Sequence, residues 1–234
     1  MSTELSQLLE LAAADHGRLC PRQVLGVRIG LAGVAALQTS AAGSPLQLLV
    51  ILETDGCFVD GVGAATGCTV GKRSLRIEDY GKVAATFVNM RNEHAVRVAP
   101  RAGIRQRAYA YAPGESRRYF AQLHGYQVMP DAELLTIQRV HLLKSVAEIM
   151  SRAGVRVDCA ACGEEIINER EVYRGGMVLC RACAGAGYYV AACDRDLPLE
   201  PQPAHPRALT RNGRRAASAL RPITTDPAGR HAGD

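Results

Sequence analysis

The stretch E-T-D-G-C-F-V-D-G-V-G-A-A-T-G-C-T-V-G-K, residues 53–72, follows an apolar run at 46–52 that has the composition of a buried strand. It holds two cysteines, two aspartates, one lysine and five glycines. Glycine destabilises a helix interior, and a strand, a turn and a helix need no reactive side chains to form. This composition predicts a binding or catalytic site at the end of a buried strand.

The segments on either side of this stretch indicate an α+β fold. Helical spacing covers residues 6–15, 21–38, 58–66, 100–112 and 116–125, and strand-like segments cover 75–77, 82–90, 95–99 and 134–142. Gly26, Gly30 and Gly33 recur along the second helix and indicate close packing rather than a phosphate loop. We therefore expect helices packed on an antiparallel or mixed sheet, with a meander from residue 75 onward.

Composition limits the class of protein. The 234 residues are 47% apolar, which suits a globular core. The longest run without charged or strongly polar residues has twelve members, 182–193, fewer than the roughly twenty that a bilayer-spanning helix needs. The first residues show no basic region followed by an apolar stretch, so we expect a cytoplasmic protein without a membrane partner.

The chain is expected to divide into a core domain at 1–150, a four-cysteine domain at 155–193 and a tail at 194–234. The tail holds six of the eleven prolines and seven arginines, and we expect it to be disordered and basic. The net charge of +5 is mild and concentrated there, which is weak support for nucleic-acid binding.

In the reducing cytoplasm, eight cysteines favour metal ligands or reactive thiols over disulfides.

Two C-x-x-C pairs give the strongest motif. Seventeen residues separate the pair Cys159 and Cys162 from the pair Cys180 and Cys183. This spacing is typical of a structural zinc site with four thiolates at about 2.3 Å, and a single iron is the rival metal. Such a shell leaves no position for water or substrate, so it is structural, and Cys193 is expected to be a spare thiol.

A second group consists of His16, Cys20, Cys57 and Cys68. An imidazole and thiolates suit zinc or another soft-ligand metal, with a position left open. The alternative is that Cys20 and Cys68 are small buried apolar residues and His16 a capping residue. For an enzyme, Cys57 would be the nucleophile or a metal ligand, Asp60 or His16 the proton carrier, and Lys72 an anion anchor.

Two glycine motifs in the opening stretch do not fit nucleotide-binding loops. G-C-T-V-G-K-R, from Gly67 to Arg73, has three residues between its glycines where a P-loop has four, and arginine follows the lysine where serine or threonine is needed. Gly61 and Gly63 lack the third glycine of a dinucleotide fingerprint. The sequence thus argues against ATP or GTP hydrolysis and against a dinucleotide fold.

Four motifs resemble the FmdE-like family, which is named for a component of formylmethanofuran dehydrogenase. They are D-H-G-R-L-C-P at 15–21, E-T-D-G-C-F-V-D at 53–60, T-G-C-T-V-G-K-R-S-L at 66–75 and D-Y-G-K-V-A-A-T-F-V at 79–88. The resemblance covers roughly residues 5–145. It implies an α+β core, a C-terminal zinc finger, intertwined homodimers, and convergence of His16, Cys20, Cys57 and Cys68 on one site.

The chain departs from this family in the first motif. The usual H-G-H-x-C-P-G reads H-G-R-L-C-P-R here, so that Arg18 stands at a histidine position and Arg22 at a glycine position. If Arg18 replaces a ligand, the affinity or specificity of a core metal changes.

Three functions remain in view at this point. The resemblance implies a zinc-binding, dimeric accessory protein, associated with a molybdenum or tungsten enzyme of one-carbon metabolism and carrying a second metal or a ligand in its core. One alternative is a thiol- or metal-dependent enzyme acting on a small molecule at Cys57. The other is a metal-responsive regulator that binds nucleic acid through the finger and the arginine-rich tail.

Overall fold

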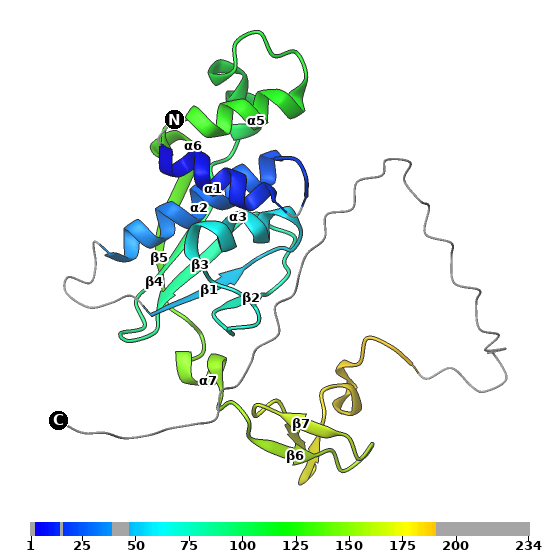
Figure 1. Ribbon diagram of the computed structural model, residues 1–234. Coiled ribbons are helices and arrows are strands. Elements are labelled where there is room, and N and C mark those ends of the chain that lie inside the picture. The colour runs from blue at the N-terminus through cyan, green and yellow to red at the C-terminus, as the bar shows by residue number, and fades with distance from the viewer. Residues whose placement is uncertain (1–2, 15, 39–46, 191–234) are drawn as a thin grey trace, which may run out of the picture. The chain divides into compact units, whose positions relative to one another are not determined.

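The computed structural model describes residues 3–14, 16–38 and 47–190 (Figure 1). One compact unit comprises Met1–Ala186, and a second begins at Gly187. The expected tail at 194–234 and Cys193 lie outside the described residues. The predicted boundary between 150 and 155 stays a prediction, because the compact unit includes both the core and the four-cysteine segment.

Three N-terminal helices cover one face of the sheet (Figure 1): α1 (Thr3–Ala13), α2 (Pro21–Gln38) and α3 (Cys57–Thr66). The glycines of α2 allow this helix to approach its neighbours closely. A Cβ atom at Gly26 would lie 2.5 Å from the Phe58 carbonyl oxygen, and one at Gly33 would lie 2.2 Å from the Phe87 ring. The predicted packing role of these glycines is therefore confirmed.

The core sheet has five strands: β1 (Leu48–Leu52), β2 (Leu75–Ile77), β3 (Ala85–Asn89), β4 (Ala95–Pro100) and β5 (Leu135–Val140). Their order is β2-β1-β3-β4-β5. The β1–β2 pair is parallel and the other pairs are antiparallel. The predicted α+β class with a mixed sheet is confirmed.

The predicted meander is wrong for β2. Val50 is paired with Leu75 in parallel register, so β2 lies beside β1 and not beside β3. The chain leaves β1, crosses over through α3 and returns in the same direction, as in a βαβ unit. This crossover places the start of α3 at the carboxyl end of β1.

Both faces of β1 are apolar, because its side chains alternate between two clusters. Val50 and Leu52 belong to the main core with residues of α2, including Val24. Leu49 packs on the other face with Val146, the first residue of α7 (Val146–Met150). Burying one such side chain stabilises the fold by roughly 1.5–3 kcal/mol, so this strand is a rigid support for the segment that follows it.

The segment between β4 and β5 forms short helices: α4 (Ile104–Arg107), η1 (Ala108–Tyr111), α5 (Arg118–Val128) and α6 (Asp131–Leu134). The helix predicted at 100–112 is broken, because β4 extends to Pro100 and Gly103 adopts a φ of 76°. Arg28 of α2 donates hydrogen bonds of 2.7 Å to the carbonyl oxygens of Tyr126 and Met129. These bonds attach the end of α5 to the main core.

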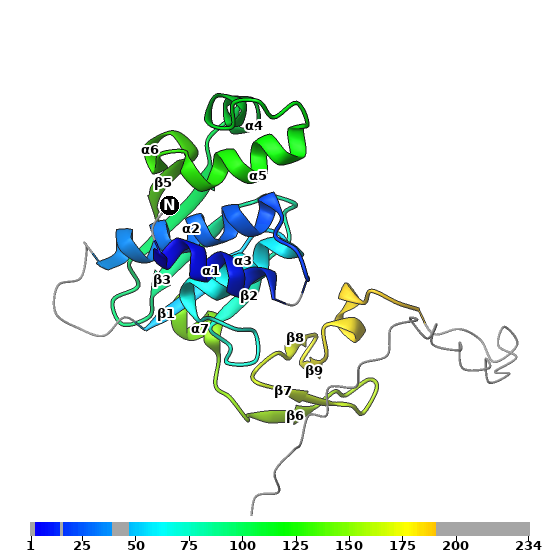
Figure 2. The same ribbon diagram turned by 45° about the horizontal axis from the view of Figure 1, so that its top comes forward.

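Two small hairpins follow α7 (Figure 2): β6 (Arg156–Asp158) with β7 (Glu165–Ile167), and β8 (Val172–Arg174) with β9 (Met177–Leu179), before η2 (Ala182–Ala186). Their buried cluster is small, with only Cys159, Ile166, Leu179 and Ala184 at its centre. Such short strands need support beyond their own apolar contacts.

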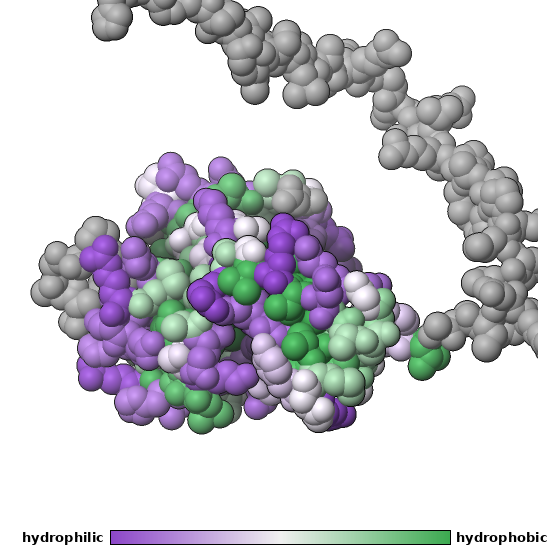
Figure 3. Space-filling model, turned by 90° about the horizontal axis from the view of Figure 1, so that it is seen from below, coloured by the Kyte–Doolittle hydropathy of each residue, from purple (hydrophilic) through white to green (hydrophobic). Residues whose placement is uncertain are grey.

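Across the surface, apolar and polar side chains are mixed. Figure 3 shows one such face, on which hydrophobic and hydrophilic residues lie side by side. Leu143 and Tyr173 are among the exposed large apolar residues. In the ranges that the structure describes, no helix has both the length and the apolar character needed to cross a bilayer.

Candidate metal centre and thiol site

Four cysteine sulfurs meet at the two small hairpins. Cys159 and Cys162 lie in the turn between β6 and β7, whereas Cys180 follows β9 and Cys183 lies in η2. Their Sγ atoms all lie within 4.8 Å of one another. The N–H of Cys180 donates to Sγ of Cys159 at 3.2 Å, and the N–H of Cys183 donates to Sγ of Cys180 at 3.4 Å. The turns therefore hold the sulfurs together.

This arrangement fits a tetrahedral metal ion. Metal–sulfur bonds of about 2.3 Å require sulfurs about 3.8 Å apart, so only a small contraction is needed. The backbone N–H groups of Cys180 and Cys162 lower the pKa of the Cys159 thiol to about 6. Hydrogen bonds with the thiols of Cys180, Cys162 and Cys159 raise the pKa of Cys183 to about 12. The four-cysteine group can hold a metal ion that replaces these shared protons.

The second site begins where β1 ends. Gly56 has φ 74° and ψ −157°, a backbone conformation that L-residues rarely adopt, and it turns the chain directly into α3. Cys57 is the first residue of that helix, and Asp60 lies in its first turn. Cys20 precedes α2, and its carbonyl oxygen accepts the first hydrogen bond of that helix, from the N–H of Val24 at 3.2 Å. Both thiols thus lie at helix starts.

A buried glutamine fixes the loop that carries His16 and Cys20. The Gln23 side chain is fully buried; its Nε2 donates to the carbonyl oxygen of Ala12 at 2.6 Å and its Oε1 accepts from the N–H of Cys20 at 2.9 Å. These two bonds connect the end of α1 to the start of α2. Gln23 was not predicted from the sequence, although a polar residue inside an otherwise apolar helix is a signal for such a role.

Reactive side chains meet in two pairs at this point, His16 with Asp60 and Cys57 with Cys20. Among the described residues, the four cysteines of the hairpins are the only group of three or more such side chains whose ligand atoms all lie within 4.8 Å of one another. Nε2 of His16 lies 2.7 Å from Oδ2 of Asp60. Burial, the hydrogen bond to the Cys20 thiol and the charges of Cys20 and Asp60 raise the pKa of the Cys57 thiol, although its contact with a backbone N–H opposes this effect. At neutral pH, Cys57 is therefore protonated unless a cation replaces the proton.

Cys68 and Lys72 lie elsewhere in the chain. Cys68 is buried beyond the far end of α3, where its Sγ lies 3.9 Å from the carbonyl oxygen of Leu48, the first residue of β1. Since α3 has ten residues, its length of about 15 Å separates Cys68 from Cys57. Lys72 is exposed in the loop beyond Cys68. The expected convergence of Cys68 with His16, Cys20 and Cys57 is not found within one chain, because Cys68 lies beyond the far end of α3. The contacts near the start of α3 are those of His16 with Asp60 and of Cys57 with Cys20.

The two residues that depart from the family motif, Arg18 and Arg22, are close to Cys20 in sequence but lie in different elements of the structure. Arg18 is exposed on the loop between α1 and α2. Arg22, in the first turn of α2, places Nη1 3.9 Å from the position that a Cβ atom would take at Gly56. Asp55 is exposed just before that turn. Arg22 therefore adds a positive charge beside the start of α3.

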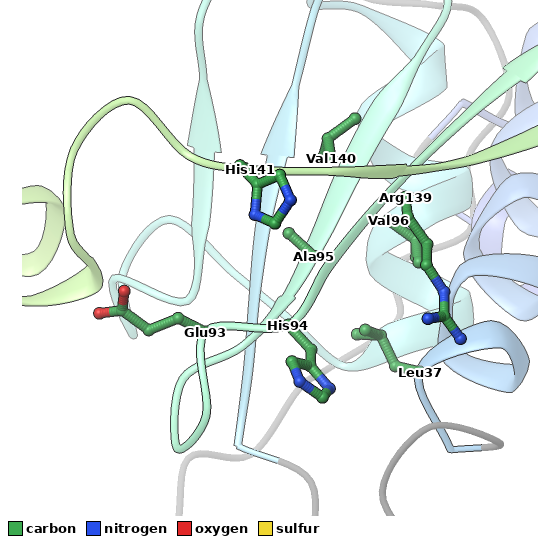
Figure 4. Close-up of a pocket in the computed structure, with 8 residues that line it drawn as sticks. All are labelled: Leu37, Glu93, His94, Ala95, Val96, Arg139, Val140 and His141. Carbon is green, nitrogen blue, oxygen red and sulfur yellow. The ribbon is translucent and has the colours of Figure 1, made fainter.

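A cavity of about 240 Å³ lies away from these residues, at the ends of β4 and β5 (Figure 4). His94 precedes β4 and His141 follows β5, and Glu93 points away from both histidines in Figure 4. The Glu93 carboxylate instead accepts a hydrogen bond of 2.9 Å from the N–H of Val146. None of the predicted thiol-site residues lines this cavity, so it is a different site.

Fold and site together define a mixed α+β protein with half-buried thiols at the starts of two helices and a four-cysteine group that can hold a metal ion. Residues 15–136, more than half of the chain, match the family described as FmdE, molybdenum formylmethanofuran dehydrogenase operon. The chain belongs to this FmdE family.

One relative in sequence and one in structure accompany this match. Over 99 residues the chain is 38% identical to a protein of Archaeoglobus fulgidus named as a probable S-adenosyl-L-methionine-binding protein; this match covers 41% of the chain and only 27% of that relative. A tungsten formylmethanofuran dehydrogenase FmdE-like protein of Syntrophus aciditrophicus has a similar structure, with a TM-score of 0.51 and 20% identity. The alignment covers 80% of this chain and 95% of that one. At this identity the similarity shows the fold.

Proposed function

We propose that this FmdE-family chain is a cytoplasmic accessory protein that binds zinc and serves a molybdenum or tungsten enzyme of one-carbon metabolism. The proximity of the four sulfurs, within 4.8 Å of one another, carries the metal-binding part of this proposal. Family membership supports the association with the enzyme. The four-cysteine hairpins are structural in this proposal and present a surface to the partner protein.

The core group is proposed to hold a second metal ion or a small ligand. His16, Cys20 and Cys57 supply one imidazole and two thiols, a donor set suited to zinc with one position left open. Asp60 holds the imidazole at Nε2, which leaves Nδ1 as the nitrogen available to a metal. Bound there, the metal would supply Lewis acidity or a fixed point of attachment for a ligand.

Elemental analysis of full-length variants tests both sites. We expect two metal equivalents per chain in the wild type, one in Cys180→Ser and one in Cys57→Ser. Cys68→Ser is the matched control, because its thiol lies outside both groups, and it should retain two equivalents. A single equivalent in the wild type that Cys57→Ser leaves unchanged would remove the core metal from the proposal. Full metal content in Cys180→Ser would remove the four-cysteine metal from the proposal.

The accessory protein is further proposed to be a homodimer. Strand β5 forms one edge of the sheet, and Ile137 on this strand is 48% exposed. An exposed edge with an apolar side chain favours pairing with another strand. Light scattering should give twice the mass of one chain for the wild type and a lower mass for Ile137→Lys. A monomeric wild type at micromolar concentration would contradict the dimer.

A thiol-dependent enzyme is the second candidate, favoured by the contact between the thiols of Cys57 and Cys20. The raised pKa of Cys57 argues against a resting thiolate nucleophile, because the thiolate is the reactive form. Alkylation rates measured against pH distinguish the two candidates. An accessory metal site predicts slow alkylation of Cys57 at pH 7 and blocking by bound metal. A metal-independent rate that is already maximal at pH 7 would favour the enzyme.

A further inference from the structure

A second feature of the chain lies outside the thiol group: a cavity of about 410 Å³ lined by four arginines. Arg73 and Arg76 come from the loop before β2 and from β2 itself, and Arg170 and Arg181 come from the segment of the two small hairpins. All four belong to the compact unit Met1–Ala186. Neither the metal-binding proposal nor the thiol group makes use of this cavity.

Two of the guanidinium groups are held in place by the end of α7. Arg73 donates from Nη2 to the carbonyl oxygen of Met150 and, at 3.1 Å, to Oγ of Ser151. Arg170 donates from Nη2 to the carbonyl oxygen of Ile149 at 3.2 Å. Fixing long side chains before a ligand arrives reduces the conformational entropy lost on binding. The cavity is therefore preorganised on the side that faces α7.

The third guanidinium, that of Arg76, has unused hydrogen-bonding capacity. Its Nε atom is buried and has no hydrogen-bond partner among the described residues. Burial and the positive charges of Arg170 and Arg73 lower the pKa of Arg76, and Glu78 only partly opposes them. An unpaired buried donor close to other cations costs free energy, and an anion would offset this cost.

The lining residues also define the charge and size of a ligand. Four arginines and the single lining acid, Glu78, give the lining a net charge of +3. A diphosphate ester carries two to three negative charges and several oxygens that match guanidinium forks. A cavity of about 410 Å³ falls within the range of roughly 300–1,000 Å³ that is common for small-molecule sites. Ile77 adds an apolar surface that is 41% exposed.

We propose that this cavity binds a small molecule through its diphosphate group. The diphosphate accepts hydrogen bonds from Arg76 and from the two arginines fixed by α7, while the rest of the molecule lies against the apolar side chains of the cavity. A free diphosphate and a nucleoside diphosphate share this chemistry, and the affinities of the two separate them. The site uses neither the thiols at the starts of α2 and α3 nor the four cysteines as contacts, but Arg170 and Arg181 come from the segment of the small hairpins, so the site requires that segment to be folded.

Isothermal titration calorimetry with the full-length, metal-loaded protein tests this inference. The probes are pyrophosphate, ADP, inorganic phosphate and adenosine, at constant ionic strength. We expect pyrophosphate and ADP to bind at least about tenfold more tightly than inorganic phosphate, and adenosine to show no binding. Tighter binding of ADP than of pyrophosphate would identify an organic diphosphate as the ligand, and the reverse would identify the free anion. Equal, weak binding of all anions would overturn the proposal.

Matched variants locate the binding. Arg76→Gln and Arg170→Gln should each weaken pyrophosphate binding at least about tenfold, the usual effect of losing hydrogen bonds from a charged group. Arg174→Gln is the control, because Arg174 lies on β8 and does not line the cavity. Thermal melts of each variant establish that it is folded. Equal losses of pyrophosphate affinity in Arg174→Gln and Arg76→Gln would overturn the site. Binding of oligonucleotides that depends on these arginines, without binding of pyrophosphate or ADP, would also overturn it.

Discussion

Nε2 of His16 lies 2.7 Å from Oδ2 of Asp60 and joins the loop before α2 to the first turn of α3. The side chains are 43% and 37% exposed, so water screens this pair. The pair therefore contributes little to stability, and its role is to position the imidazole. The bond fixes the imidazole beside two helix starts that carry thiols, which is the relationship expected between a metal ligand and the carboxylate that orients it.

Asp60→Asn separates an orienting role from a stabilising one. An exposed ion pair contributes about 0–1 kcal/mol, so the free energy of unfolding should change by less than about 1 kcal/mol. The affinity of the core metal should fall about 10–100-fold, because the histidine loses the charged carboxylate that fixes its ring. Competition with a chromophoric chelator measures this affinity. Asp55→Asn is the control on the same stretch, and equal affinities in the two variants would contradict the orienting role.

Much of the fold could be predicted from the sequence because strong local signals coincide with its elements. Proline at a helix start and apolar spacing predicted 21–38, and the structure has α2 at Pro21–Gln38. The neighbour of β2 could not be predicted. Three residues carry too little pattern to choose between β1 and β3, and the choice depends on the crossover of α3, which is a tertiary contact.

Glycine substitutions test the close packing of α2 on α3. A Cβ at Gly61 would lie 2.3 Å from the carbonyl oxygen of Gln23, and one at Gly26 would lie 2.5 Å from that of Phe58. Backbone atoms cannot move away cheaply, so each alanine variant should lose about 1–3 kcal/mol of stability or more. Urea unfolding measures this loss.

Gly63 provides the matched control on α3. A Cβ there would lie 3.6 Å from the carbonyl oxygen of Cys68, an ordinary contact. Gly63→Ala should therefore be neutral or stabilising by up to about 1 kcal/mol, because alanine favours the helix. Equal stabilities of Gly61→Ala and Gly63→Ala would contradict the packing described for the two helices.

The site was less predictable than the fold. Spacing indicated the four-cysteine group because both ends of each C-x-x-C lie within one turn. The thiol group depends on which end of α3 each residue occupies, and Cys57 and Cys68 lie at opposite ends of that helix. The arginine-lined cavity had no sequence signal, because Arg76 and Arg170 are distant in the chain and alternate with ordinary surface residues.

Acid should weaken α7 through its capping box. The hydroxyl and the backbone N–H of Ser145 lower the pKa of Glu148 from its ordinary value of 4.5. Because the pKa is lower in the folded state, this stabilisation is complete above about pH 4.5 and is lost as the pH falls through the lowered value. The difference in melting temperature between wild type and Glu148→Gln should therefore shrink between pH 6 and pH 3. In a Ser145→Ala background the change with pH should be smaller, because only the backbone N–H of residue 145 remains to lower the pKa of Glu148. A wild-type difference that stays constant with pH would contradict the linkage.

Removal of metal should unfold the two small hairpins and leave the core sheet intact. The hairpins bury only four residues at their centre, one of which is the ligand Cys159, so their apolar contacts cannot offset the entropy of ordering. Two amides report this in hydrogen exchange. The N–H of Ala160 donates to the carbonyl oxygen of Val178 at 2.8 Å and should lose its protection when a chelator is added. The N–H of Val50 donates to the carbonyl oxygen of Ser74 at 2.8 Å and should keep its protection. Cys180→Ser should show the same pattern without chelator. Continued protection of Ala160 in protein proven free of metal would mean that the hairpins fold without an ion.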